Sequence, residues 1–210
     1  MPAMPSSCQG RRCRKSRWFT YARRSATYRP PVPIEDACKA FTLSSGESLA
    51  SASSRQTLAI VFLRHFGCTF TRRILRELEG LKAEADRRGT RLILVHMLEK
   101  GSETEYLDRK NGVDVIADPH CELYRAFGLG KGGFFELFGP RVWLPLISSL
   151  VRGCGMGHLA GDGMQMPGAF LLRESTVIAS QRPRTQAFLP DLSRLFEDSP
   201  ALPGLLKIPA

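Results

Sequence analysis

The chain has 210 residues, 43% of them hydrophobic, which is enough for one domain of ordinary size with a buried core. Its net charge of +10 points to a nucleic-acid or membrane partner, but residues 1–30 hold eight basic residues and no acid. The other twenty-two basic residues face twenty acids, so we expect no nucleic acid to bind the folded domain.

The six cysteines are spread over the whole chain, and no two of them have CxxC spacing. This pattern is unlike a secreted disulfide framework and unlike a zinc ribbon, and it favours a reducing compartment. The four histidines lie far apart, so we expect no metal site, and no motif calls for a cofactor. No apolar run reaches the roughly 18–20 residues of a transmembrane segment.

Residues 1–35 are basic and rich in serine, and they end in a run of prolines. Three interpretations remain open for this arm: a disordered segment, a targeting segment, or an extension that is not part of the natural protein. We therefore expect a cytoplasmic protein, or an organellar one if the arm is a transit peptide. The predicted domain covers residues 36–198, and residues 199–210 form a tail.

The first strong pattern is the apolar run 58–63, which is typical of a strand buried on both faces. Residues 41–56 before it predict a loop or a short hairpin. Residues 69–88 after it predict a long helix, since apolar side chains recur every three or four positions. Gly89 then stands where a left-handed helix cap is favoured.

The later elements alternate in type. They are predicted in this order: strand 91–97, a polar helix 102–110 capped by Ser102, strand 113–117, a helix from Asp118 to Phe127 with Pro119 in its first turn, a glycine-rich insertion 129–166 with a helix at 142–151, strands 169–172 and 176–180, and helix 185–196. This alternation predicts an α/β fold with a mixed central sheet and helices on both faces. A helical insertion precedes the final hairpin and helix.

Cys68 falls at the junction between the first strand and the long helix. The free N–H groups and the positive dipole of a helix N-terminus favour a thiolate over a thiol. Arg64, His65, Arg72 and Arg73 add positive charge nearby, and the hydroxyl of Thr71 lies one turn further on. The alternative is that Cys68 is a small buried hydrophobic residue, as many free cysteines are.

Three segments carry a resemblance to a known family: FLRHFGCTFTRR (62–73), ADPHCELYRAFGLGKG (117–132) and GDGMQMPGAFLL (161–172). They resemble the peroxiredoxin-like proteins of the alkyl hydroperoxide reductase/thiol-specific antioxidant (AhpC/TSA) superfamily. The nearest group includes selenoprotein-L-like and redox-regulatory peroxiredoxin-like members. The resemblance covers about residues 40–197 and implies a thioredoxin-like fold.

The resemblance implies roles for individual residues. Cys68 matches the redox thiol, and Thr71 stands where a second cysteine often lies. Pro167 would be a cis-proline that, with Met166, faces the thiol. The proline and threonine that precede the peroxidatic cysteine in true peroxiredoxins are replaced by Val61 and His65.

The implied function is that of a thiol-dependent antioxidant oxidoreductase acting in cell redox homeostasis. Cys68 would attack a peroxide or a mixed disulfide, Arg64 would stabilise the developing charge, and His65 would tune the thiol. Cys154 or Cys121 would resolve the oxidised form, or an external thiol such as glutathione or a thioredoxin-like protein would reduce it. A homodimer is possible. The alternative is a catalytically weak module that senses redox state or binds a protein.

Overall fold

The computed structural model describes residues 32–107, 112–132, 147–148, 151, 162–183, 185 and 187–199, all within the unit Pro31–Ala210. The predicted arm up to residue 31, most of the predicted helix 142–151, Cys154 and the tail from residue 200 lie outside these residues. Within the described part, no helix is long and apolar enough to cross a membrane.

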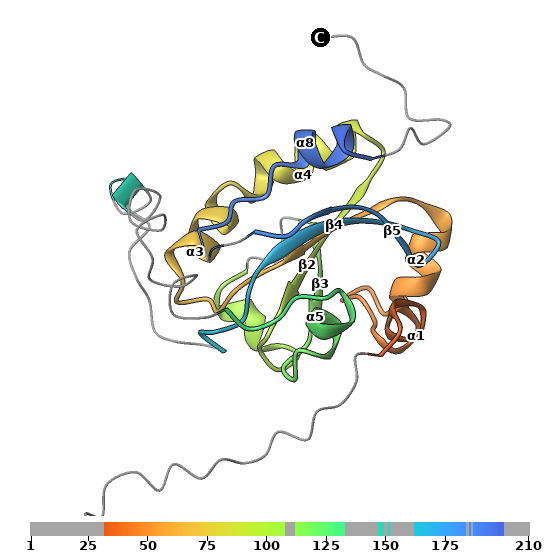
Figure 1. The fold of residues 1–210 in the computed structure, drawn as a ribbon, viewed down its shortest axis with the longest axis horizontal. Coiled ribbons are helices and arrows are strands. Elements are labelled where there is room, and N and C mark those ends of the chain that lie inside the picture. Colours follow the sequence, from red (N-terminus) through yellow and green to blue (C-terminus); the bar gives the residue numbers. More distant parts are fainter. Residues whose placement is uncertain are drawn as a thin grey trace, which may run out of the picture. The chain divides into compact units, whose positions relative to one another are not determined.

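Five strands form one mixed sheet in the order β3-β2-β1-β4-β5 (Figure 1). The strands are β1 (Leu58–Phe62), β2 (Arg91–His96), β3 (Asp114–Ala117), β4 (Gly168–Arg173) and β5 (Thr176–Gln181). β1 pairs in parallel with β2, and β2 with β3, whereas β4 is antiparallel to both β1 and β5. The prediction of a mixed central sheet is confirmed.

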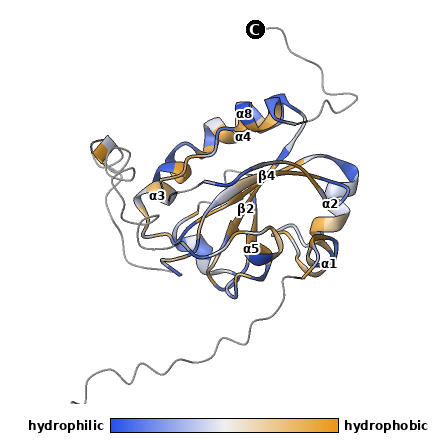
Figure 2. Ribbon diagram, viewed as in Figure 1, coloured by the Kyte–Doolittle hydropathy of each residue, from blue (hydrophilic) through white to orange (hydrophobic). Residues whose placement is uncertain are grey.

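Helices cover both faces of the sheet, and alternate strand residues pack against each layer. One layer contains α1 (Ile34–Ala40), α2 (Leu49–Arg55) and α5 (Glu122–Ala126), which share an apolar cluster with Ile60 and Phe62. The other contains α3 (Thr69–Arg76), α4 (Leu78–Arg87) and α8 (Leu192–Glu197), which pack with Ala59 and Val61. Figure 2 shows the apolar residues gathered along the strands and on the helix sides that face them. All five residues of β1 are buried, as a strand covered on both faces requires.

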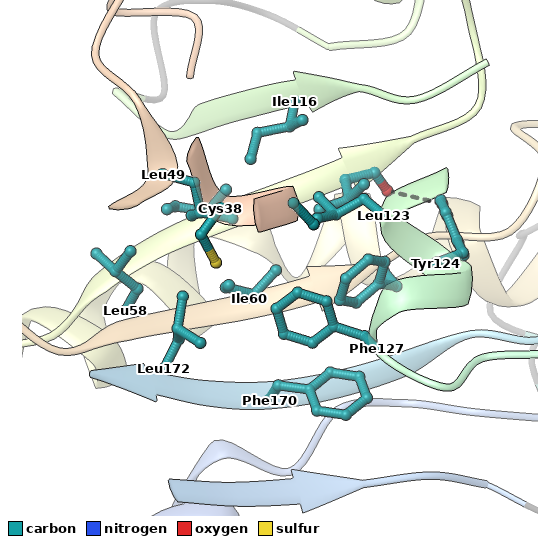
Figure 3. Close-up of a cluster of buried hydrophobic side chains, with 14 of the residues drawn as sticks. Cys38, Leu49, Leu58, Ile60, Ile116, Leu123, Tyr124, Phe127, Phe170 and Leu172 are labelled. Atoms are coloured by element: carbon teal, nitrogen blue, oxygen red, sulfur yellow. Dashed lines mark hydrogen bonds between the residues drawn. The ribbon is translucent and has the colours of Figure 1, made fainter. Parts of the chain in front are cut away.

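The layer that contains α1 and α5 is rich in aromatic rings (Figure 3). The ring of Phe62 lies 4.9 Å from that of Tyr124 and 5.0 Å from that of Phe127, measured between centroids. Cys38 is fully buried in the same layer. This close-packed layer supports the β1 end from which the chain continues towards Cys68.

The helix predicted over residues 69–88 is divided at Glu77, which separates α3 from α4. The backbone of Glu77 leaves the helical region with φ −91° and ψ 7°. The predicted apolar face still packs on the sheet, because Ile74, Leu78 and Ala85 all belong to one buried cluster. Gly89 has φ +61°, which confirms the left-handed cap.

Two short helices near the start of the domain were not predicted. α1 begins at Ile34, inside the range assigned to the arm, and the Pro33 carbonyl accepts the Ala37 N–H at 3.0 Å as its first intrahelical bond. α2 lies within the predicted loop 41–56, where the Ser48 hydroxyl accepts the Ser51 N–H and caps the helix. These caps act over three or four residues and leave little trace in hydrophobic periodicity.

Three other helix predictions are wrong in their boundaries. Residues 102–105 form a short 3₁₀ turn entered through Gly101 at φ +99°, and Ser102 caps no helix there. α5 begins at Glu122 rather than at Asp118, although the Asp118 carboxylate does accept N–H bonds from the first turn. The last helix begins at Leu192 rather than 185, because Pro190 disfavours helical geometry in the residue before it.

Candidate active site

Cys68 stands directly before α3, close to the carboxyl end of β1. Its N–H donates to the His65 carbonyl at 2.9 Å, and its own carbonyl accepts the Arg72 N–H at 3.0 Å. It therefore occupies the helix N-cap, as the sequence predicted. Its side chain is 6% exposed and accepts no hydrogen bond from a backbone N–H of the first helical turn.

The sulfur instead accepts a hydrogen bond from Arg64. The Nη1 atom of Arg64 lies 3.1 Å from the Cys68 Sγ, and the arginine is 4% exposed. A guanidinium stays protonated at any ordinary pH, and a hydrogen bond between two charged partners is about twice as strong as a neutral one. The hydrogen bond lies in a place where little water competes with it.

Two backbone carbonyls far along the chain orient the same guanidinium. The Nε atom of Arg64 donates to the Gln165 carbonyl at 3.2 Å, and Nη2 donates to the Gly163 carbonyl. Sequence reasoning missed both acceptors, because a backbone carbonyl carries no side-chain signal. The proximity of 163–165 to Arg64 arises only when β4 pairs with β1.

His65 does not supply the positive charge that the sequence predicted. Burial and the neighbouring Arg64 charge lower the pKa of His65 to about 4, so the ring is neutral at pH 7. Its Nδ1 atom is buried without a hydrogen-bond partner. Arg73 is directed elsewhere, since its Nε lies 3.0 Å from the Glu77 carboxylate. Of these side chains, Arg64 is the one that the structure shows bonded to the sulfur.

Thr71 is buried at 1% exposure, but no hydrogen bond joins its hydroxyl to the Cys68 sulfur. A hydroxyl that the sequence did not single out is more notable. The Oγ1 atom of Thr69, next to Cys68, is buried without a hydrogen-bond partner. The apolar neighbours of Cys68 are Phe70 and Ala187.

The expectation of a cis bond between Met166 and Pro167 is wrong, because no cis peptide bond occurs in the described residues. The trans form is intrinsically favoured, and the Met166 N–H is already bonded to the Gly130 carbonyl at 3.1 Å in this arrangement. Met166 is 9% exposed and lies just before β4. The apolar cluster that contains Cys68 includes neither Met166 nor Pro167.

Of the two proposed resolving cysteines, only Cys121 is among the described residues. It belongs to the apolar layer of α1 and α5, whereas Cys68 packs in a separate cluster. Burial raises the pKa of Cys121 to about 11, helped by the nearby Asp118 charge. The structure therefore does not bring Cys121 and Cys68 together.

Three cavities of the described part lie away from the thiol. These cavities, of about 300, 250 and 450 Å³, lie near β2 and β3, and Cys68 lines none of them. Among the residues that the structure describes, no group of histidine, cysteine and acidic side chains is arranged to hold a metal. In the described part of the site, the thiol of Cys68 thus lies beside the guanidinium of Arg64.

Comparison with known proteins adds a family context. The family model for the AhpC/TSA antioxidant enzyme matches residues 77–184, just over half of the chain. A prostamide/prostaglandin F synthase from Sus scrofa is 28% identical over 128 residues, or 59% of this chain. Those residues make up 63% of the relative, so the match spans less than two thirds of its length.

Two of the similar solved structures are bacterial. The bacterioferritin comigratory protein of Xanthomonas campestris is 18% identical, with a TM-score of 0.47 and coverage of 70% of this chain and 83% of that one. A cysteine-to-serine mutant of PrxQ from Xylella fastidiosa is 14% identical, with a TM-score of 0.49 and coverage of 73% and 82%. The family match begins at Glu77, so the assignment of Cys68 and Arg64 depends on their geometry.

Proposed function

The chain belongs to the AhpC/TSA antioxidant enzyme family, and we propose that it is a thiol-dependent peroxidase whose reacting atom is the Cys68 sulfur. One observation carries this proposal: the buried guanidinium of Arg64 donates a hydrogen bond to that sulfur at 3.1 Å. Such an arrangement stabilises the nucleophilic thiolate and provides a donor for negative charge that develops on oxygen.

In the proposed reaction, the Cys68 thiolate attacks one oxygen of a hydroperoxide. A sulfur–oxygen bond forms as the oxygen–oxygen bond breaks, so that the sulfur loses two electrons and becomes a sulfenic acid. The leaving alkoxide or hydroxide takes a proton and departs as an alcohol or water. Arg64 is suited to stabilise the developing negative charge on oxygen, because its Nη1 already faces the sulfur.

An external thiol completes the proposed cycle. One thiol condenses with the sulfenic acid, releasing water and leaving a mixed disulfide on Cys68, and a second thiol reduces that disulfide. Two features of the site support an external reductant over an internal one. Thr71 occupies the position of a second cysteine, and Cys121 packs in a different apolar layer.

Redox sensing is the second function that the site favours. Cys68 is only 6% exposed, which restricts attack by a bulky reductant on the oxidised sulfur. A protein that is oxidised once and reduced slowly reports peroxide rather than removing it. The two functions differ in the number of turnovers, not in the first chemical step.

The test is oxidation of the purified chain by hydrogen peroxide, with the sulfenic acid trapped by dimedone and located by mass spectrometry. We expect the adduct on Cys68 and its loss in Cys68→Ser, while Cys38→Ser and Cys121→Ser react as the unmodified protein does. Repeated consumption of peroxide in the presence of glutathione supports the peroxidase, and consumption of a single equivalent of peroxide supports the sensor. Unchanged peroxide reduction by Cys68→Ser would overturn both.

A further inference from the structure

The contact between Arg64 and Cys68 depends on a turn formed by residues 162–166. Two donors of the guanidinium, Nε and Nη2, are bonded to carbonyls of this turn, and a third, Nη1, reaches the sulfur. Because the guanidinium is rigid and planar, a shift of the two carbonyls also shifts Nη1. The position of the 162–166 turn therefore sets the geometry at the sulfur.

The loop 129–132, which follows α5, holds the 162–166 turn in place. Backbone hydrogen bonds join them in both directions, from the Met166 N–H to the Gly130 carbonyl at 3.1 Å and from the Gly132 N–H to the Met164 carbonyl at 2.8 Å. An isolated antiparallel bridge pairs Lys131 with Gln165. Through this single bridge and its flanking bonds, the position of the turn depends on only a few hydrogen bonds.

The side chain of Gln165 provides the buried part of this connection. It is 2% exposed, and its Nε2 donates to the carbonyls of Leu129 and Gly130, each at 3.1 Å. A further contact of 3.4 Å reaches the Met166 carbonyl. Each buried hydrogen bond of this kind stabilises the connection, and the loss of one partner leaves the other buried and unsatisfied.

An exposed ion pair links the same two segments but is weaker. The Lys131 Nζ lies 2.6 Å from the Asp162 carboxylate, with the lysine side chain 67% exposed and the aspartate 32%. Exposed pairs of this kind contribute little, because water and salt screen the two charges. The side-chain part of the connection thus resides mainly in Gln165, whose own carbonyl is also the acceptor for Arg64 Nε.

We propose that Gln165 is a positioning residue for the thiol site. Its carboxamide anchors the 162–166 turn to the 129–132 loop, and its backbone carbonyl holds Arg64 against Cys68. The inference depends on the proposed function in one respect, that Arg64 activates the sulfur. Gln165 itself touches neither the thiol nor a substrate in this assignment.

The test uses Gln165→Met, which keeps the length of the side chain and removes both amide donors. The rate of iodoacetamide alkylation at Cys68 is measured from pH 5 to 10 and compared with that of Arg64→Met. We expect Gln165→Met to move the midpoint of the pH profile upward, in the same direction as Arg64→Met, and to slow the reaction at pH 7 about 5–10-fold. The double variant should be no slower than Arg64→Met alone.

Met164→Leu is the matched control, because Met164 lies in the same turn with a side chain 42% exposed. We expect its pH profile to be unchanged, since its backbone bonds remain. Gln165→Asn, which keeps the amide but shortens its reach, replaces Gln165→Met if that variant does not fold. A shift in Arg64→Met with none in Gln165→Met or Gln165→Asn would overturn this inference. No shift in Arg64→Met would overturn the activation of Cys68 by Arg64 and, with it, the role of Gln165.

Discussion

The molecule buries cysteines in two very different places. Cys38 (Figure 3) and Cys121 lie in the apolar layer between the sheet and helices α1 and α5, at 0% and 7% exposure. Cys68 is 6% exposed, but its sulfur accepts a hydrogen bond from a guanidinium. The three cysteines are buried to a nearly equal degree, but only Cys68 accepts a hydrogen bond from a charged side chain among the contacts that the structure describes.

The difference between the thiols lies in the groups that surround each sulfur, not in its depth. Burial raises the pKa of both Cys38 and Cys121 to about 11, because the lost hydration of the thiolate outweighs the Ser175 hydrogen bond at Cys38 and the Arg125 and Lys131 charges at Cys121. At Cys68 the protein replaces water with one fixed donor that is itself held by backbone carbonyls. Preorganised donors of this type are the usual means of activating a nucleophile.

The largest expected effect is in alkylation of the three thiols. At pH 8 a thiol with a pKa of about 11 is only about one thousandth ionised, so in the folded chain we expect Cys38 and Cys121 to react with iodoacetamide at least about 100-fold more slowly than Cys68. Mass spectrometry of the separated peptides gives each rate. In urea the three rates should converge. If Cys121 in the folded chain is labelled as fast as Cys68, the expected difference between the two kinds of thiol is wrong.

The next effect concerns Tyr124, which connects the two regions. Its fully buried hydroxyl donates to the carbonyls of Leu63, at 2.5 Å, and Val95, at 3.0 Å, and Leu63 directly precedes Arg64. We expect Tyr124→Phe to lower the free energy of unfolding by about 1–3 kcal/mol, because the Leu63 carbonyl loses a buried partner. Urea denaturation measures this change.

Tyr106→Phe is the control for that variant, since Tyr106 is 41% exposed and stacks on Phe66 through its ring. We expect its unfolding free energy to change by less than about 0.5 kcal/mol. Equal effects of the two substitutions would show that the Tyr124 hydroxyl bonds do not stabilise the end of β1.

The smallest effect is on the pH dependence of stability through His65. Its pKa falls from 6.5 in the unfolded chain to about 4 in the fold, so the folded state binds fewer protons between these values. The contribution of His65 to the free energy of unfolding is therefore fully present above pH 6.5 and is lost as the pH falls towards 4. We expect the free energy of unfolding to fall by about 1 kcal/mol less in His65→Gln than in the unmodified protein between pH 7.5 and pH 4.5. Urea denaturation at the two pH values measures this difference.

His96 contributes to the pH dependence of stability in the same direction, because burial lowers its pKa as well. The pH dependence that His96 causes should persist in His65→Gln. An identical pH dependence in the unmodified protein and in His65→Gln would show that the His65 ring titrates alike in both states.

Much of the central architecture can be predicted from the sequence. The uninterrupted apolar run 58–63 and the run 91–97 become adjacent parallel strands, and the hairpin 169–180 pairs as predicted. The sequence also predicts that Cys68 lies directly before a helix, because strand-to-helix junctions have local signals in periodicity and charge. Arg64 lies four residues before Cys68 in the same junction. These features are short-range, so the chain itself encodes them.

The contacts of the site are decided by tertiary structure. No pattern in the sequence indicates that the carbonyls of Gly163 and Gln165 hold a guanidinium about a hundred positions earlier, or that the Gln165 amide is bonded to the 129–132 loop. It was equally unpredictable that Thr71 makes no bond to the sulfur and that the Met166–Pro167 bond is trans. The physical reason is that backbone acceptors are alike at every residue, and only the pairing of β1 with β4 selects which of them meet Arg64.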